Sequence, residues 1–277
     1  MLGGSVKTSQ TGDAMIAGWG MRMGLLTEGE PPPFIVETVS AESRFLLTAD
    51  HAGRMIPKRL GDLGLAAAAL ERHIAWDIGI AGVTRRLAAA LGASAIYQRY
   101  SRLVIDCNRQ PSVPSAFPQV SEATVIPGNA TLSDADKLQR QQEIFEPYHG
   151  AIRKLIAGYV GRKPIYVAMH SFTSVYLGVA RPMHVAVLYH RNPDLSRILA
   201  GLLRMEPGLV VAENEPYRVS DETDYGVPVH AEAGGLDYVE IEIRQDLIAD
   251  ERGQDEWAAR LARLLPVAAD KLEECRV

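Results

Sequence analysis

Two histidines of this sequence directly follow apolar segments that are typical of buried strands. His51 ends the stretch FLLTADH (45–51), and His170 follows the run IYVAM (165–169). Ligands of open α/β sheets bind beyond the carboxyl ends of the strands, so we expect both imidazoles at one edge of a sheet. Imidazole nitrogen is a common zinc ligand. The pair therefore predicts a hydrolytic metal site, and the alternative for either histidine is a hydrogen-bonded structural role.

A third ligand is needed, because hydrolytic zinc sites take about three protein ligands and leave one position open. Asp77, which follows Trp76 at the start of a predicted helix, is the preferred carboxylate. His73 lies four residues earlier and would share a helix face with Asp77. His73 is thus a rival ligand or a residue that orients the site. We expect Asp50, beside His51, to support a ligand from behind or to shape the turn.

The segment VEIEIRQDL (239–247) supplies two further carboxylates. Alternation along a strand places Glu240 and Glu242 on the same face, opposite two isoleucines. A carboxylate beside a metal site can act as general base, taking a proton from water and passing it to the leaving nitrogen. Glu242 is the candidate for this role. The alternative is a salt bridge with Arg244 or another arginine, which is the preferred interpretation of Glu240.

The segment SRLVIDCNR (101–109) holds two arginines, an aspartate and an asparagine around an apolar trio. Guanidinium groups bind carboxylates in a bidentate manner, so the segment suits an anionic substrate. Its candidate contacts are Arg102, Asn108 and Arg109. A structural pair between Arg102 and Asp106 is the alternative.

Three other residues complete the candidates. Arg181, in VARPMH, is a further anion contact or transition-state stabiliser, and we include it among the catalytic residues. Ser171 beside His170 is placed among the substrate contacts. A serine nucleophile is disfavoured there, because no G-x-S-x-G segment surrounds it. Cys107 is disfavoured as a nucleophile, because its acidic and amide neighbours offer little to stabilise a thiolate.

The elements that must position these residues alternate between strands and helices from residue 44 onward. Apolar runs predict strands at 44–48, 95–97, 103–105, 165–169, 185–188, 209–212 and 239–243. Helical periodicity predicts a helix from Trp76 to Leu91 that Gly92 ends, and a last helix through Trp257–Leu272. Between them, the capping box Ser133-x-x-Asp136 opens a helix that Pro147 should kink or split. This alternation indicates a three-layer α/β fold with a mostly parallel mixed sheet and helices on both faces.

Length and composition set the class of protein. The chain has 277 residues, of which 47% are hydrophobic and 23% charged, as in a globular domain. We expect residues 1–40, rich in Gly, Ser and Thr, to form a loosely ordered arm before a single domain at 41–277. The net charge of −5 without a basic stripe argues against nucleic acid as partner. Two distant cysteines favour a reducing cytoplasm, and no signal peptide or membrane-spanning run is evident.

Seven motifs occur in order along the chain: DHAGRMIP (50–57), WDIG (76–79), YSRLVIDCNR (100–109), PYH (147–149), MHSFTS (169–174), NEPY (214–217) and EIRQDL (242–247). Together they resemble the N-formylglutamate amidohydrolase family, most closely its branch with HSF and EIRQDL signatures. The resemblance implies a phosphorylase/hydrolase-like α/β fold similar to zinc carboxypeptidases. It also implies hydrolysis of N-formyl-L-glutamate to formate and glutamate.

The resemblance gives several residues a role. It implies metal ligands at His51 and His170, an acidic position at Asp77, a general base at Glu242, and carboxylate contacts at Asn108 and Arg109. One departure from the pattern concerns the metal. Zinc carboxypeptidases carry H-x-x-E, whereas Arg54 stands three residues after His51 here. Asp77 therefore has to replace the missing glutamate.

The sequence as a whole predicts an amidohydrolase that depends on Zn²⁺ or another divalent metal. Its expected substrate is a small anionic N-acyl amino acid such as N-formyl-L-glutamate, and its expected state is a monomer or homodimer. Two alternatives remain. One is a metallopeptidase or deacylase that acts on another N-acyl amino acid or a small peptide. The other is a non-catalytic binding protein for an anionic metabolite.

Overall fold

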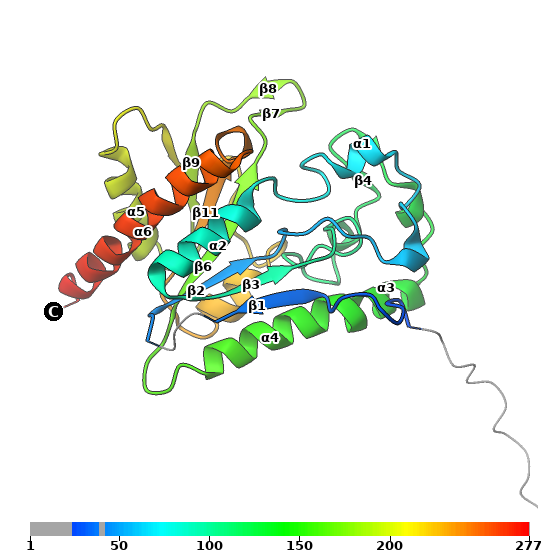
Figure 1. Ribbon diagram of the computed structural model, residues 1–277, viewed down its shortest axis with the longest axis horizontal. Helices are drawn as coiled ribbons and strands as arrows, with labels where there is room; N and C mark the ends of the chain where they lie inside the picture. The colour runs from blue at the N-terminus through cyan, green and yellow to red at the C-terminus, as the bar shows by residue number, and fades with distance from the viewer. Residues whose placement is uncertain (1–23, 39–41, 277) are drawn as a thin grey trace, which may run out of the picture.

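The computed structural model describes residues 24–38 and 42–276 of the chain. Its centre is a seven-stranded sheet with the strand order β1-β3-β2-β6-β11-β9-β10 (Figure 1). The strands are β1 (Phe34–Glu37), β2 (Phe45–Ala49), β3 (Ser94–Gln98), β6 (Ile165–Phe172), β9 (Val185–Leu188), β10 (Val211–Glu213) and β11 (Tyr238–Arg244). Only the β1–β3 and β9–β11 pairings are antiparallel among these neighbours. The sheet is thus mixed and mostly parallel, as predicted.

Helices cover both faces of this sheet. On one face lie α2 (Ile80–Leu91), α5 (Asp194–Arg204) and α6 (Glu251–Glu274), and on the other lie α3 (Asp134–Arg140) and α4 (Glu146–Ala157) (Figure 1). Each layer of apolar side chains forms its own core. On β11, Ile241 and Ile243 belong to the core under α6, whereas Tyr238 belongs to the core under α4. The predicted three-layer α/β class is confirmed.

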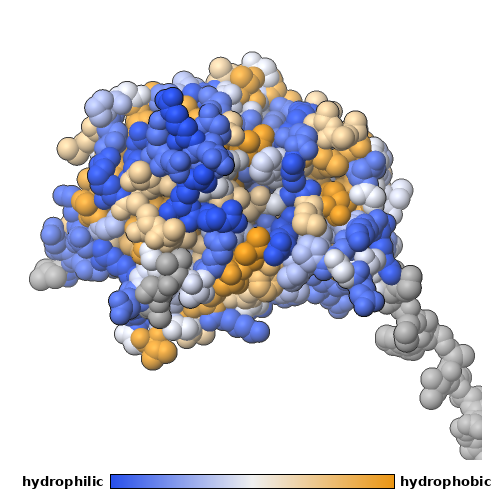
Figure 2. Space-filling view, in the orientation of Figure 1, coloured by the Kyte–Doolittle hydropathy of each residue, from blue (hydrophilic) through white to orange (hydrophobic). Residues whose placement is uncertain are grey.

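Shorter elements complete the chain. They are the helix α1 (Ala67–Leu70), the hairpins β4 (Val120–Ser121) with β5 (Thr124–Val125) and β7 (Val175–Tyr176) with β8 (Val179–Ala180), the π-helical turns Gln141–Phe145 and Gly226–Glu232, and the 3-10 turns Lys58–Leu60, Pro114–Ala116, Pro127–Asn129 and Gln245–Leu247. On the face shown in Figure 2, hydrophilic and apolar side chains are interspersed. No helix in the described part of the chain is long and apolar enough to cross a membrane.

The predicted helix after Trp76 begins later than its apolar spacing indicates. α2 starts at Ile80, because Gly79 takes the left-handed φ of 81° and a Cβ there would lie 2.1 Å from the carbonyl oxygen of Ile248. Gly92, at φ 60°, ends the helix as predicted. His73 lies in a turn before α2, so the expectation that it shares a helix face with Asp77 is wrong.

The middle helical segment agrees with its sequence signals. Ser133 and Asp136 form both hydrogen bonds of a capping box at the start of α3. The π-helical turn then separates α3 from α4, and Pro147 lies in the first turn of α4, where its missing N–H does no harm. The last helix and the strand at 185–188 also form as predicted.

The predicted strand at 103–105 is wrong. Leu103, Val104 and Ile105 are buried, but they form a turn. Side chains satisfy their backbone in place of a neighbouring strand. Asn129 Nδ2 donates to the carbonyl of Leu103, and Arg140 Nη1 donates to that of Val104, both at 2.8 Å. An apolar trio has the same appearance in sequence whether a strand or a buried turn contains it.

The predicted arm contains part of the folded domain. β1, at residues 34–37, pairs with β3 through Phe34 opposite Gln98. Leu25 is also buried, and its N–H donates to Glu143 Oε1 at 2.6 Å. The expected domain boundary at residue 40 is therefore too late. The rest of the arm, residues 1–23 and 39–40, lies outside the described residues.

Candidate active site

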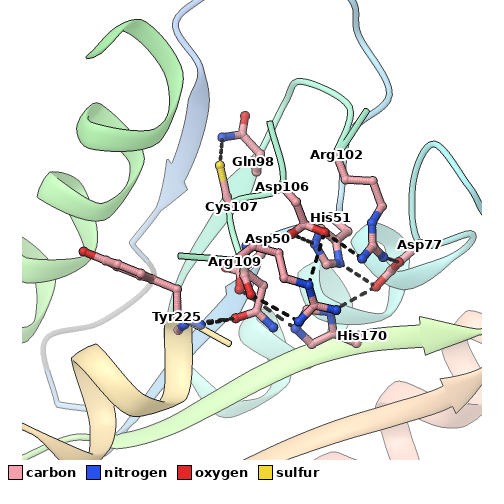
Figure 3. Close-up of polar contacts among 12 residues, drawn as sticks. Asp50, His51, Asp77, Gln98, Arg102, Asp106, Cys107, Arg109, His170 and Tyr225 are labelled. Atoms are coloured by element: carbon pink, nitrogen blue, oxygen red, sulfur yellow. Dashed lines mark hydrogen bonds and ion pairs between the residues drawn. The ribbon is translucent and has the colours of Figure 1, made fainter. Parts of the chain in front are cut away.

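The sheet topology brings the candidate residues to one edge. His51 comes just after β2, His170 lies in β6, and Glu242 lies in β11, three neighbouring parallel strands. In the register of β6 and β11, Glu242 stands beside His170. Asp77 reaches the same place from the loop before α2 (Figure 3). These four side chains line one cavity of about 330 Å³.

Three of these side chains are arranged as metal ligands. His51, Asp77 and His170 are buried, and one ligand atom from each lies within 4.8 Å of the other two. Asp77 Oδ2 is 3.5 Å from His51 Nδ1 and 3.1 Å from His170 Nδ1. Ligand atoms around a tetrahedral zinc at ~2.0–2.1 Å would lie about 3.3 Å apart. The spacing therefore fits zinc.

Two further observations favour a cation at this place. The buried His51 Nδ1 has no hydrogen-bond partner among the described residues, and a buried nitrogen without a partner is costly. Burial lowers the pKa of His170, but the hydrogen bond with Asp77 and the charge of Glu240 outweigh it and raise that pKa to about 10. The surroundings thus stabilise positive charge, and the residues fit a divalent metal. His73 stands apart from this group, with Nε2 3.8 Å from Glu122 Oε2.

A carboxylate supports His51 from the side away from the ligand group. His51 Nε2 lies 2.7 Å from Asp106 Oδ1, and Asp106 Oδ2 accepts from Arg102 Nη2 at 2.7 Å. Burial alone would raise the pKa of Asp106, but the charges of Arg102 and His51 hold it well below its usual range. The structure therefore contains the Arg102–Asp106 ion pair that was the alternative to a substrate contact at Arg102. The contact to His51 was missed, because no sequence spacing links residues 51 and 106.

A carboxylate also lies near the second nitrogen of His170, although the two atoms are too far apart for a hydrogen bond. His170 Nε2 lies 3.9 Å from Asp50 Oδ2, and Asp50 Oδ1 accepts a short hydrogen bond from Tyr148. Asp50 is 1% exposed, so it is fixed within the protein interior. Carboxylates placed behind metal-binding histidines orient the rings and raise their basicity. This placement agrees with the expectation that Asp50 supports a ligand from behind.

The two glutamates of β11 have no ion-pair partner among the described residues. Arg244, the expected partner, pairs instead with Asp246 at 2.8 Å. Glu240 and Glu242 are buried, and Oε2 of each lacks a hydrogen bond. Burial, reinforced by Asp77 and Glu240, raises the pKa of Glu242 to about 8 against the opposing charge of His170. A carboxyl group with a raised pKa is suited to accept a proton.

The two arginines of the segment 101–109 line the cavity, and each forms an ion pair with an aspartate. Besides Asp106, Arg102 Nη1 approaches Asp77 Oδ1 at 3.5 Å, and Arg109 Nη1 pairs with Asp224 at 2.9 Å. Asn108 Oδ1 accepts the N–H groups of Tyr225 and Gly226, at 3.2 and 2.9 Å. These hydrogen bonds and ion pairs hold the side chains of Arg102, Asn108 and Arg109, the predicted substrate contacts, in the wall of the cavity.

The remaining candidates, Ser171 and Arg181, form hydrogen bonds with other residues around the cavity. Ser171 Oγ donates to the carbonyl of Ile78 at 2.9 Å, so it holds the loop that carries Asp77. Arg181 does not line the cavity, and its Nη1 donates to the hydroxyl of Tyr217 at 3.0 Å, which does line it. Tyr217 was missed as a site residue, although the motif NEPY contains it. Burial raises the pKa of the Cys107 thiol, in agreement with its rejection as nucleophile.

Solved structures resemble this fold. The gene product Atu2144 from Agrobacterium tumefaciens matches with a TM-score of 0.86 and 38% sequence identity, over 90% of this chain and 99% of that chain. N-formylglutamate amidohydrolase from Ralstonia eutropha JMP134 matches with a TM-score of 0.63 and 20% identity, over 86% of this chain and 98% of that chain. At that identity the second match is evidence of a shared fold. Among curated proteins, no sequence matches this chain significantly.

Family membership follows from the sequence. The model of the family described as N-formylglutamate amidohydrolase matches residues 43–249. The match includes every motif on which the resemblance was based. Because it covers well over half of the 277 residues, this chain belongs to the N-formylglutamate amidohydrolase family.

Proposed function

We propose that this protein is a metal-dependent amidohydrolase that cleaves the amide bond of a small N-acyl amino acid, with N-formyl-L-glutamate as its first candidate substrate. The observation that carries the proposal is the grouping of His51, Asp77 and His170 within 4.8 Å, next to a buried glutamate without a partner. Membership in the N-formylglutamate amidohydrolase family supports the choice of substrate.

His51, Asp77 and His170 would hold the metal. When bound, a divalent ion supplies a Lewis acid that polarises the substrate carbonyl and makes water more acidic. Two imidazoles with one carboxylate form a ligand set that zinc commonly takes in hydrolytic sites, so zinc is our first choice.

Glu242 is the proposed general base. It takes a proton from the attacking water, whose oxygen forms a bond to the acyl carbon. The carbon–nitrogen bond then breaks, and Glu242 returns the proton to the leaving nitrogen, which gives the free amine and the carboxylic acid. Its raised pKa, about 8, and its lack of an arginine partner both support this role. The reaction thus needs only the substrate and one water molecule.

The cavity favours an acyl amino acid over a peptide. Its volume of about 330 Å³ lies near the lower end of the ~300–1,000 Å³ that is usual for small-molecule sites. We place the α-carboxylate of the substrate beside Asn108 and Arg109 in the cavity wall. Arg102 and Ser171 hold the residues around it.

A substrate panel with a base variant tests the proposal. Zinc-loaded protein is assayed for release of amine from N-formyl, N-acetyl and N-succinyl amino acids. We expect highest turnover on N-formyl-L-glutamate. Glu242→Gln should lower kcat by about 10²- to 10⁴-fold, the usual contribution of a general base, while it retains bound metal. Full activity of Glu242→Gln would refute its role, and tight binding without turnover by the wild type would favour the non-catalytic alternative.

A further inference from the structure

Arg181 differs from the other arginines near the cavity, because its charge is not neutralised. Arg102 and Arg109 each pair with an aspartate, at 2.7 and 2.9 Å. No carboxylate among residues 24–38 and 42–276 lies within ion-pair distance of Arg181, and Tyr217 is the partner of its side-chain hydrogen bond. A guanidinium group carries five N–H donors, so several remain for a ligand.

Aromatic rings hold this guanidinium group in place. Its central carbon lies 4.7 Å from the ring centre of Tyr176, 5.0 Å from that of Tyr217 and 6.0 Å from that of Phe172. The backbone N–H of Arg181 also donates to the carbonyl of Ser174 at 2.8 Å, at the base of the β7–β8 hairpin that follows β6 (Figure 1). A cation stacked in this way loses little side-chain entropy when it binds an anion.

The same three rings line the cavity, so Arg181, which is not a lining residue itself, lies directly behind the lining side chains. The cavity lining includes Phe172, Tyr176 and Tyr217 as well as the candidate metal ligands His51, Asp77 and His170. Among the lining residues, Tyr217 is 42% and Tyr176 36% exposed, whereas Asn108 is 5% exposed. An N-acyl glutamate whose α-carboxylate lies beside the buried Asn108 could extend its side chain toward the two solvent-exposed tyrosines.

We propose that Arg181 and Tyr217 form the subsite for the side-chain carboxylate of the substrate and thereby select acidic N-acyl amino acids. The inference rests on the proposed function. Arg181 supplies the charge and a planar pair of N–H donors, and the Tyr217 hydroxyl, which accepts from Arg181, donates its own proton to the carboxylate. Both residues bind the substrate away from the scissile bond.

The test compares variants on two substrates of the same shape. N-formyl-L-glutamine replaces the side-chain carboxylate of N-formyl-L-glutamate by a neutral amide. Arg181→Ala should lower kcat/KM for the glutamate by about 10- to 100-fold, the usual effect of a lost hydrogen bond to a charged group, and change the glutamine value little. The loss should appear in KM and leave kcat unchanged, since the contact is the same in ground and transition states. Arg181→Lys should recover part of the loss, and Tyr217→Phe should have a smaller effect of the same kind.

Arg197 provides the matched control. It lies on α5, stacks on Tyr189 at 5.4 Å and donates to the hydroxyl of that ring at 3.4 Å, but Tyr189, unlike the rings around Arg181, does not line the cavity. Arg197→Ala should leave kcat/KM unchanged for both substrates. An equal loss on both substrates in Arg181→Ala, or a loss confined to kcat, would overturn the subsite.

Calorimetry separates this inference from the proposed function. If the zinc-loaded wild type hydrolyses neither compound, the function fails. The subsite still predicts that the wild type binds N-formyl-L-glutamate more tightly than N-formyl-L-glutamine, and that Arg181→Ala abolishes this difference. Equal binding of the two compounds by the wild type, or no binding, would overturn it.

Discussion

The Nε2 atom of His51 lies 2.7 Å from Oδ1 of Asp106, and Nδ1 of the same ring lies 3.5 Å from Asp77. A neutral imidazole carries one proton, and the carboxylate of Asp106 fixes that proton on Nε2. The lone pair of Nδ1 is then directed to the ligand group. We infer that Asp106 is a positioning residue for the proposed metal site.

Asp106→Asn should therefore weaken the binding of zinc by about 10- to 100-fold, as loss of such a supporting carboxylate usually does. Competition with a chelator of known affinity measures the effect. The matched control is Asp224→Asn, which removes a carboxylate from the same cavity wall, where it pairs with Arg109. Similar affinities in the wild type and in Asp106→Asn would contradict the role.

The identity of the third ligand can be decided by two single variants. Asp77→Ala should lose stoichiometric zinc, since its Oδ2 faces both imidazoles. His73→Ala should keep it, because His73 lies beside Glu122 outside the group. Metal analysis after dialysis measures both, with His51→Ala and His170→Ala as positive controls for loss. The reverse pattern would make His73 the ligand.

Arg140 should be important for stability, because it is 2% exposed and bonds the carbonyl of Val104 and Oδ1 of Asn129. Arg140→Met would leave both oxygens buried without this donor. We expect the free energy of unfolding to fall by about 2–4 kcal/mol, as measured by urea titration. Arg252→Met is the control, because Arg252 makes only a solvent-exposed i,i+4 pair with Glu256, and such pairs contribute little to stability. Equal losses in the two variants would contradict this account of the turn.

The stability of the protein should depend on pH through His230. Burial, with the charge of Arg153, lowers the pKa of His230 to about 4, whereas an unfolded histidine titrates near ~6.5. Below pH ~6.5 the unfolded chain therefore binds a proton that the folded chain does not. The stability that neutral His230 contributes is complete above pH ~6.5 and is lost as the pH falls toward 4, by about 3 kcal/mol at ~1.4 kcal/mol per pKa unit.

The variant His230→Gln provides the measurement. Glutamine does not titrate, and its amide N–H can replace the Nε2 atom that bonds His149 at 2.9 Å. Urea titrations between pH 7 and 4.5 should give a smaller fall in the free energy of unfolding than in the wild type. Identical slopes for the two proteins would show that His230 does not contribute.

Which elements could be predicted from sequence depends on the range of the interactions that form them. The strand β6, the capping box of α3 and the long helix α6 depend on neighbouring residues and on alternation of apolar positions, so they form as expected. The late start of α2 at Ile80 instead follows from the left-handed backbone of Gly79, which packs against the carbonyl of the distant Ile248. The turn at 103–105 depends likewise on Asn129 and Arg140.

The sequence by itself determined which residue types end the strands, and so placed His51 and His170 at one sheet edge with Glu242 nearby. It did so because parallel strands share the edge to which their carboxyl ends point. Only the tertiary structure decided the partners: Asp77 in the ligand group without His73, Asp106 behind His51, and Tyr217 beside Arg181. These partners come from loops, whose course is set by packing between distant segments and leaves no periodic signal in the sequence.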